Sequence, residues 1–139
     1  PDSRVTEQID RLNADFGRTN TDAGNTPAQF SAVDTEIQFC LANKDPQGNA
    51  TTGIVRKTAG GSPAQQGGTD LWDTDKYLNL FVYDMGGGLL GFTYTSSSAP
   101  NNAVHIGTPY FGNTGGQFGM GRTASHEVGH WLNLEHIWG

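Results

Sequence analysis

The sequence has 139 residues, enough for one domain with a buried core, and carries a formal net charge of −6. This acidic balance argues against nucleic acid and against an anionic membrane surface as partners. Twenty glycines and a charged fraction of 16% favour a loop-rich fold with strands over a helical bundle. No apolar run approaches the ~18 residues of a membrane-spanning helix. Because the chain begins at Pro1 with no signal peptide before it, we expect a processed product or an excised segment.

An amphipathic helix is predicted near the N-terminus, where apolar side chains recur at helical spacing. These side chains are Val5, Ile9, Leu12 and Phe16. Asp2 or Ser3 would cap this helix, and Gly17 would end it. We expect its apolar face to back the sheet that is formed by the strands further along the chain.

A short helix and five strands are predicted in the middle of the chain. Thr26 followed by Pro27 is typical of a helix start, so a short helix is expected through about Val33. The five predicted strands span residues 37–42, 53–57, 77–83, 89–95 and 103–106. Turns or loops are predicted at residues 45–48, 58–70, 86–88, 96–102 and 107–121. Residues 77–83 form an almost unbroken apolar run, which favours a place in the middle of the sheet.

Two residues in the predicted strands carry reactive side chains. Cys40 is the only cysteine, and it is either a buried free thiol or the partner of a residue outside this chain. Its place in the apolar run 37–42 favours burial. His105, the one histidine outside the C-terminal region, is expected to be structural rather than catalytic.

The other three histidines lie within eleven residues of one another near the C-terminus. His126 and His130 are four residues apart, so on a helix both imidazoles can reach one zinc ion at ~2.0–2.1 Å. The inner face of this helix is expected to include Val128 and Leu132. Glu127 follows the first ligand and is placed to accept a proton from a metal-bound water. A bare H-E-x-x-H sequence is also common on polar helix surfaces, so this spacing alone does not decide the function.

A third ligand requires the chain to leave the helix and turn back. On a continued helix, His136 would lie about 240° around the axis from His130, facing away from the metal. A residue that tolerates positive φ is therefore needed between them, normally Gly, with Asn as the best substitute. Asn133 stands at that place. The sequence thus predicts a three-histidine metal site, and the polar-surface alternative loses most of its weight.

The segment from His126 to Gly139 resembles the metzincin zinc signature H-E-x-x-H-x-x-G-x-x-H, with Asn133 in the Gly place. It is similar to the pappalysin family, in the microbial cytophagalysin and ulilysin branch, where Asn is a familiar variant at that place. Further similar segments lie at residues 26–30, 37–42, 51–55, 72–73, 76–79 and 121–124. The resemblance implies an α+β fold, the N-terminal subdomain of a metzincin catalytic domain. Its twisted five-stranded mixed sheet would have a backing helix and a zinc-bearing active-site helix.

The same resemblance implies a secreted zinc endopeptidase that hydrolyses protein or peptide substrates. His126, His130 and His136 would hold Zn²⁺, and Glu127 would be the general base. The family pattern continues beyond this chain with a methionine-bearing turn, and Ca²⁺ sites also lie there. A complete domain is expected to be a monomer.

In this family the fourth strand is the sheet edge, and bound peptide runs antiparallel to it. Carried over to this sequence, Leu90, Gly91 and Phe92 would line the rim of the substrate cleft. The local sequence leaves open that residues 89–95 form an ordinary strand. Met85 and Met120 precede the zinc motif, so neither can supply the methionine turn.

Two alternatives from other classes remain. The first is a zinc-binding homologue without catalytic activity, against which the retained Glu127 argues. The second is a structural or adhesion domain that uses the metal only for folding.

Overall fold

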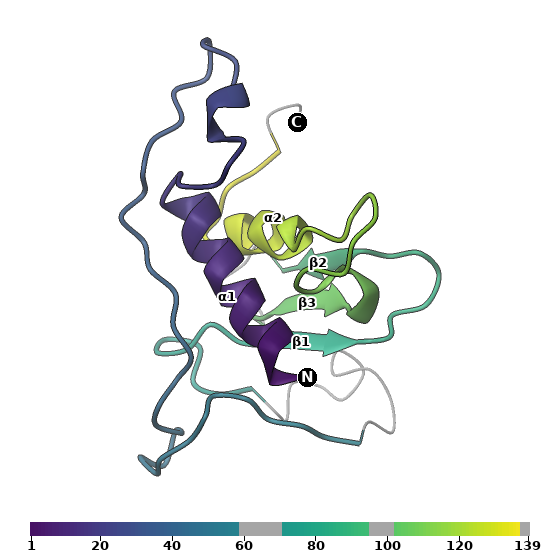
Figure 1. Ribbon diagram of the computed structural model, residues 1–139. Coiled ribbons are helices and arrows are strands. Elements are labelled where there is room, and N and C mark those ends of the chain that lie inside the picture. Colours follow the sequence, from purple (N-terminus) through teal and green to yellow (C-terminus); the bar gives the residue numbers. More distant parts are fainter. Residues whose placement is uncertain (59–70, 95–101, 137–139) are drawn as a thin grey trace.

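The computed structural model describes residues 1–58, 71–94 and 102–136 (Figure 1). The elements in chain order are α1 (Asp2–Phe16), η1 (Ala23–Asn25), β1 (Leu80–Tyr83), β2 (Gly91–Thr93), β3 (Val104–Gly107), η2 (Thr108–Tyr110) and α2 (Arg122–Trp131). The strands form one sheet in the order β1-β3-β2, with β1 parallel and β2 antiparallel to β3. The expected α+β class, mixed sheet and backing helix are confirmed, with three strands among the described residues instead of five.

The hydrophobic core lies between the sheet and the two helices. Val104 and Ile106 alternate along β3 and are fully buried, together with Leu12 of α1 and Val128 of α2. The apolar side chains predicted for α1 all belong to this core or pack against it. The helix ends at Gly17 as predicted, with a φ of −82° there, but the predicted N-terminal cap is wrong: α1 starts at Asp2 and no side chain caps its first turn.

Polar side chains of α1 fix the loop that leads into α2. The amide of Gln8 is fully buried; it donates to the carbonyl of Gly121 at 2.9 Å and accepts from the amide of Gly112 at 2.8 Å. The guanidinium of Arg4 donates to the carbonyl oxygens of Thr108 and Phe111. Because these backbone groups have buried partners, the loop reaches α2 in a fixed conformation.

The helix predicted from Thr26 to about Val33 is not formed. The Thr26 hydroxyl donates backward to the carbonyl of Ala23 at 3.0 Å and closes η1, so it does not cap a following helix. Phe30 and Val33 are exposed, at 50% and 68%. Without an apolar face to bury, this segment gains nothing from helical packing.

The first two predicted strands are also wrong. Residues 37–42 are not paired as a strand; the side-chain amide of Asn13 instead bonds both backbone groups of Phe39, at 2.7 and 3.0 Å. Gly53 has a φ of +73°, which interrupts the segment 53–57. Cys40 is exposed, which corrects the expected burial of its thiol. The turn at 45–48 is confirmed, with the amide of Gly48 donating to the Asp45 carbonyl at 2.9 Å.

The last three predicted strands are present in shorter form. Segment 77–83 contributes β1, which lies at a sheet edge and not in the middle; its Val82 is 40% exposed. The central strand is β3, in which every residue is buried. The predicted turn at 86–88 is confirmed by three consecutive glycines with positive φ. The predicted loops at 58–70 and 96–102 lie almost entirely outside the described residues.

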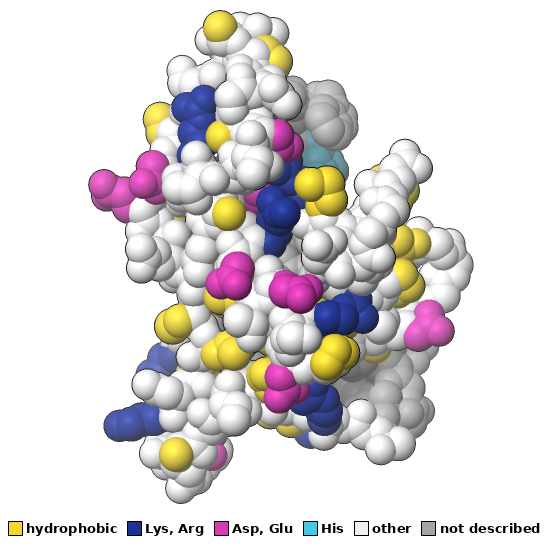
Figure 2. All heavy atoms as spheres, viewed as in Figure 1, with side chains coloured by type: hydrophobic (Ala, Val, Ile, Leu, Met, Phe, Trp, Pro, Cys, Tyr) yellow, Lys and Arg dark blue, Asp and Glu magenta, His cyan; other side chains and the backbone are white. Residues whose placement is uncertain are grey.

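The distribution of charge and the apolar character of the helices are relevant to the expected absence of nucleic-acid and membrane partners. On the face shown in Figure 2, acidic and basic side chains are interspersed, so the net negative charge does not gather in one patch there. Among the residues that the structure describes, no helix has the length and apolar character needed to cross a membrane.

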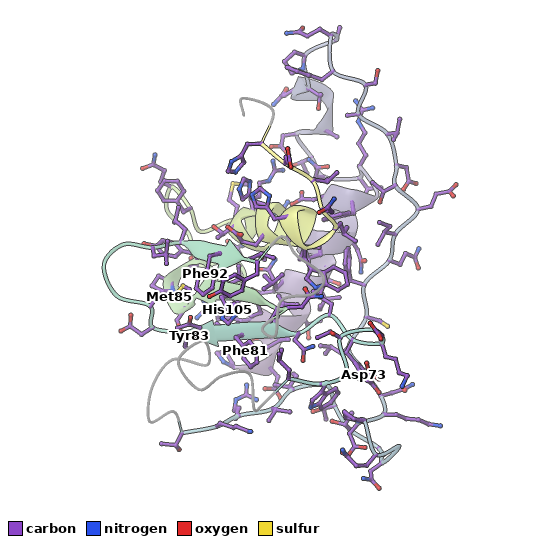
Figure 3. All side chains as sticks on the ribbon, turned by 180° about the vertical axis from the view of Figure 1, so that it is seen from behind. Asp73, Phe81, Tyr83, Met85, Phe92 and His105 are labelled. Carbon is purple, nitrogen blue, oxygen red and sulfur yellow. The ribbon has the colours of Figure 1, made fainter. Side chains whose placement is uncertain are left out.

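His105 lies at the centre of the sheet, on the face opposite α2, and is 1% exposed. Its ring stacks on Phe92 at a centroid distance of 4.4 Å and on Phe81 at 5.3 Å, while Tyr83 approaches edge-on (Figure 3). Burial lowers the pKa of His105 from 6.5 to about 4, so the imidazole is neutral in the folded protein at neutral pH. This environment supports the expected structural role.

We expect His105 to make folding stability depend on pH. Between about pH 6.5 and 4 the unfolded chain binds a proton at His105 that the folded chain does not. Stability therefore falls as the pH drops through this window, by about 3 kcal/mol in total. Urea unfolding of the wild type and of His105→Phe, both in chelator, measures the difference. The unfolding free energy of His105→Phe should fall less with acidification than that of the wild type. If it depends on pH equally in both proteins, His105 is not the group responsible.

Candidate active site

Helix α2 carries two of the three C-terminal histidines on one face. Ala124 and Val128 are fully buried in the core and fix the rotation of the helix. This rotation leaves His126 exposed and His130 partly exposed on the other side, four residues apart. Gly121 precedes the helix with a φ of +73°, which turns the chain sharply into α2.

The imidazoles of His126, His130 and His136 converge on one point. Their Nε2 atoms lie 3.0, 3.0 and 3.1 Å from one another. A tetrahedral zinc ion bound at ~2.0–2.1 Å would separate such nitrogens by about 3.4 Å, so a shift of a few tenths of an ångström admits the ion. The three predicted histidines thus form a cluster that could hold a metal ion.

One hydrogen bond orients His130 for this role. Its Nδ1 lies 2.7 Å from the carbonyl oxygen of Leu134. A carbonyl oxygen only accepts, so Nδ1 carries the proton and Nε2 keeps its lone pair for a metal. Partners of this kind fix the tautomer and ring orientation of metal-binding histidines.

The end of α2 brings His136 back to the other two histidines. Asn133 has a φ of +68°, the left-handed conformation that its position in the motif predicts. Its amide donates to the His130 carbonyl at 2.8 Å, and the Leu134 amide donates to the Gly129 carbonyl at 3.0 Å. These two bonds form a Schellman motif, which ends the helix and reverses the chain.

Glu127 lies on the buried side of the site and is 8% exposed. Burial is the main influence on its carboxyl group and raises the pKa of Glu127, while nearby His130 and the Thr93 hydroxyl oppose this effect. A carboxylate with a raised pKa is a stronger proton acceptor, as a general base requires. A cation held by the three imidazoles would lower this pKa again.

The three residues predicted at the substrate rim lie at β2, which is an edge strand of the described sheet. The ring of Phe92 stacks on His105, on the sheet face away from α2. Leu90 precedes the strand, and its carbonyl oxygen accepts a hydrogen bond from the Gly107 amide of β3 at 2.8 Å. Gly91 faces α2, where the side chain of Glu127 lies. The Leu90 carbonyl is thus committed to β3, and the substrate role of this segment stays a prediction.

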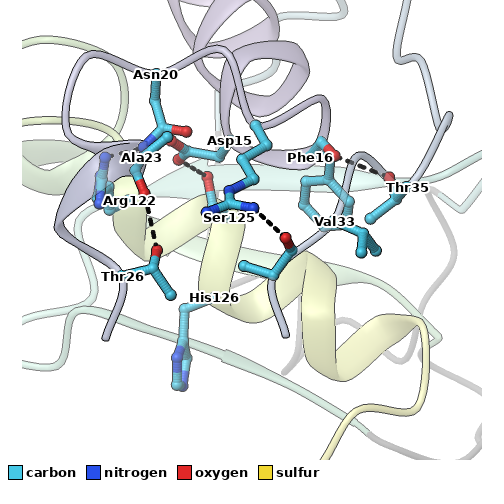
Figure 4. Close-up of a pocket in the computed structure, with 12 residues that line it drawn as sticks. Asp15, Phe16, Asn20, Ala23, Thr26, Val33, Thr35, Arg122, Ser125 and His126 are labelled. Carbon is cyan, nitrogen blue, oxygen red and sulfur yellow. Dashed lines mark hydrogen bonds and ion pairs between the residues drawn. The ribbon is translucent and has the colours of Figure 1, made fainter. Parts of the chain in front are cut away.

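A polar network behind His126 was not predicted from the sequence. The Ser125 hydroxyl donates to the Asp15 carboxylate at 2.6 Å (Figure 4). The Arg122 guanidinium bonds Asp22 at 2.5 Å. Asp15, Arg122 and Ser125 line a pocket of about 430 Å³ that reaches His126. The network ties the first turns of α2 to α1 and to the segment that follows α1. Its partners are about a hundred residues apart in sequence, so no local pattern indicated it.

The chain is similar to known metalloproteases, although no model of a protein family matches it. An extracellular metalloprotease of Arthroderma otae is 29% identical over 148 residues, which cover 99% of this chain and 46% of the relative. One of Pyricularia oryzae is 35% identical over 108 residues, covering 72% of this chain and 36% of the relative.

A solved structure, Tannerella forsythia mature mirolysin in complex with a cleaved peptide, superposes with a TM-score of 0.88 at 38% identity. The match covers 100% of this chain and 58% of that chain. The chain thus spans about half the length of the proteins it matches. The chain is related to mirolysin and to fungal extracellular metalloproteases.

Proposed function

We propose that the chain is the zinc-binding, N-terminal subdomain, residues 1–139, of a secreted metzincin endopeptidase of the pappalysin family. One observation carries this proposal: three imidazole Nε2 atoms lie 3.0–3.1 Å apart, next to the buried carboxylate of Glu127. The relatedness to metalloproteases supports it, and the names of the fungal relatives support an extracellular location.

The donor set fits Zn²⁺. Three imidazole nitrogens leave one tetrahedral position open, as in catalytic zinc sites. His126, His130 and His136 bring no negative charge to the site, so the charge of the bound cation remains available to stabilise an oxyanion. When bound, Zn²⁺ lowers the pKa of a water molecule and polarises the scissile carbonyl.

Glu127 moves the proton in the proposed reaction. Its carboxylate accepts a proton from the attacking water and then delivers it to the amine of the leaving peptide. Burial of Glu127 keeps bulk water away from the carboxylate and supports this exchange, because a desolvated carboxylate accepts a proton more readily.

The substrate is proposed to be an extended peptide that adds to the free edge of β2. Those main-chain groups of Leu90, Gly91 and Phe92 that do not bond β3 would bond the peptide backbone, as in other cases of strand addition. The cleaved peptide bound to mirolysin supports a peptide substrate. The wall opposite β2, the methionine turn and any Ca²⁺ sites are proposed to belong to the remaining part of the catalytic domain.

Metal removal tests the proposal against its two alternatives. In the intact protein, a chelator should abolish cleavage of a broad peptide library while the circular dichroism spectrum stays folded, and added Zn²⁺ should restore cleavage. Unfolding on chelation would instead indicate a structural zinc module. A zinc-loaded protein that cleaves no peptide in the library would indicate an inactive homologue.

A further inference from the structure

Glu127 lies directly against the edge strand, in a space that one glycine leaves open. We propose that Gly91 and Thr93 of β2 are positioning residues for the general base, Gly91 by making room for its side chain and Thr93 by contacting its carboxyl group. This inference rests on the proposed function, in which Glu127 moves the proton. It assigns the α2-facing side chains of β2 a role apart from substrate binding.

The glycine at position 91 is required for space and not for backbone conformation. Its φ is not among the positive ones, so an L-residue could adopt the same backbone. A Cβ at this place would lie 3.1 Å from the Cγ of Glu127 and 3.1 Å from the Cδ1 of Ile106. It would also lie 2.8 Å from the carbonyl oxygen of His105, closer than real Cβ contacts. Any larger residue must therefore displace Glu127 or the strand itself.

Thr93 faces the same side of β2 as Gly91, because alternate residues of a strand share a face. Its hydroxyl oxygen is buried, on the face of β2 that packs against α2, the helix that carries Glu127. No described group completes a hydrogen bond of good geometry with this hydroxyl. A hydroxyl both donates and accepts, so a small shift would let Thr93 bond the Glu127 carboxyl group both before and after the proton is transferred.

A purely structural role is the competing explanation, because Gly91 also packs against the backbone of β3. Gly107 provides a matched control in the same sheet. A Cβ there would lie 3.0 Å from the Cδ2 of Tyr110 and 3.2 and 3.3 Å from the carbonyl oxygens of Leu89 and Leu90, so its three nearest atoms do not include Glu127. Gly107→Ala therefore crowds the same part of the sheet, whereas Gly91→Ala crowds the general base itself.

The test measures kcat, KM, zinc affinity and melting temperature for variants of the intact protein. Gly91→Ala should lower kcat on the order of 10²-fold, as a misplaced catalytic group does. Thr93→Val, which keeps the shape of the side chain but removes the hydroxyl, should lower kcat roughly tenfold. Thr93→Ser, which keeps the hydroxyl, should have a kcat close to that of the wild type. Zinc affinity and KM should change little in all three variants. Gly107→Ala should lower the melting temperature without a matching loss of kcat.

A second comparison separates positioning from stability. If Gly91 and Thr93 act through Glu127, then adding Gly91→Ala or Thr93→Val to Glu127→Gln should not slow the residual reaction further. Additive losses, a Thr93→Val variant with wild-type kcat, or a weakened zinc site in Thr93→Val would each overturn the inference. If Gly91→Ala does not fold, the comparison of Thr93→Val with Thr93→Ser alone tests the inference. Wild-type turnover in Glu127→Gln would instead overturn the proposed function.

Discussion

Replacing Glu127 by Gln is expected to lower the rate of peptide cleavage by ~10²–10⁴-fold or more, with zinc still bound. The amide fills the same buried space beside β2 and can still bond a water molecule. It cannot accept the proton of that water, so the attacking nucleophile is not formed. The three imidazoles are untouched, and the tautomer of His130 is set by the Leu134 carbonyl and not by Glu127.

Metal analysis and a peptide-cleavage assay on the same preparation check this result. Glu7→Gln, on α1 and exposed to solvent, is a matched control that makes the same chemical change away from the metal site. Glu7→Gln should cleave at the wild-type rate. A Glu127→Gln protein that retained wild-type turnover would remove this residue from the mechanism, while one that lost zinc would show that the carboxylate is needed for the metal site itself.

The histidine cluster that could hold a metal ion could be predicted from the sequence because its determinants are local. Two ligands share one helix face, and the residue that ends the helix lies between them and the third ligand. The left-handed φ of Asn133 and the convergence of the three Nε2 atoms follow from this short segment alone. Local backbone preferences and helix periodicity are sufficient for such an inference.

The N-terminal strands could not be predicted in the same way. Residues 37–42 have the apolar composition of a strand, yet the Asn13 side chain, 26 residues away, bonds the backbone of Phe39. That bond replaces strand pairing as the partner of the backbone groups. The role of Gly91 was equally hidden, because it depends on the side chain of Glu127, which comes from a helix much later in the chain.

The conformation of Asn133 links the end of α2 to two of the three metal ligands. It directs the chain toward His136, and the same reversal places the Leu134 carbonyl 2.7 Å from Nδ1 of His130. A change at position 133 should therefore move one ligand and loosen the orientation of another. Loss of such outer contacts typically weakens metal affinity by ~10–100-fold.

We expect Asn133→Gly to keep the zinc affinity of the wild type, because Gly reaches positive φ without a steric cost. Asn133→Val should bind zinc far more weakly, on the order of 10²-fold, because a β-branched residue at φ +68° is strained by roughly 1–3 kcal/mol. Moving His136 away from the metal relieves that strain. Competition with a fluorescent chelator ranks the three proteins.

Glu36 provides the control for backbone strain alone. It also has a left-handed backbone, with a φ of +60°, and it is exposed in the segment that follows α1. Glu36→Val should therefore cost a similar amount of folding stability, because the same strain arises, while zinc affinity stays at the wild-type value. If Asn133→Val binds zinc as tightly as the wild type, the left-handed turn does not hold His136 at the metal, and the third ligand must be positioned by other contacts. If Glu36→Val weakens zinc binding as much as Asn133→Val does, the loss reports general destabilisation and not the geometry of the helix end.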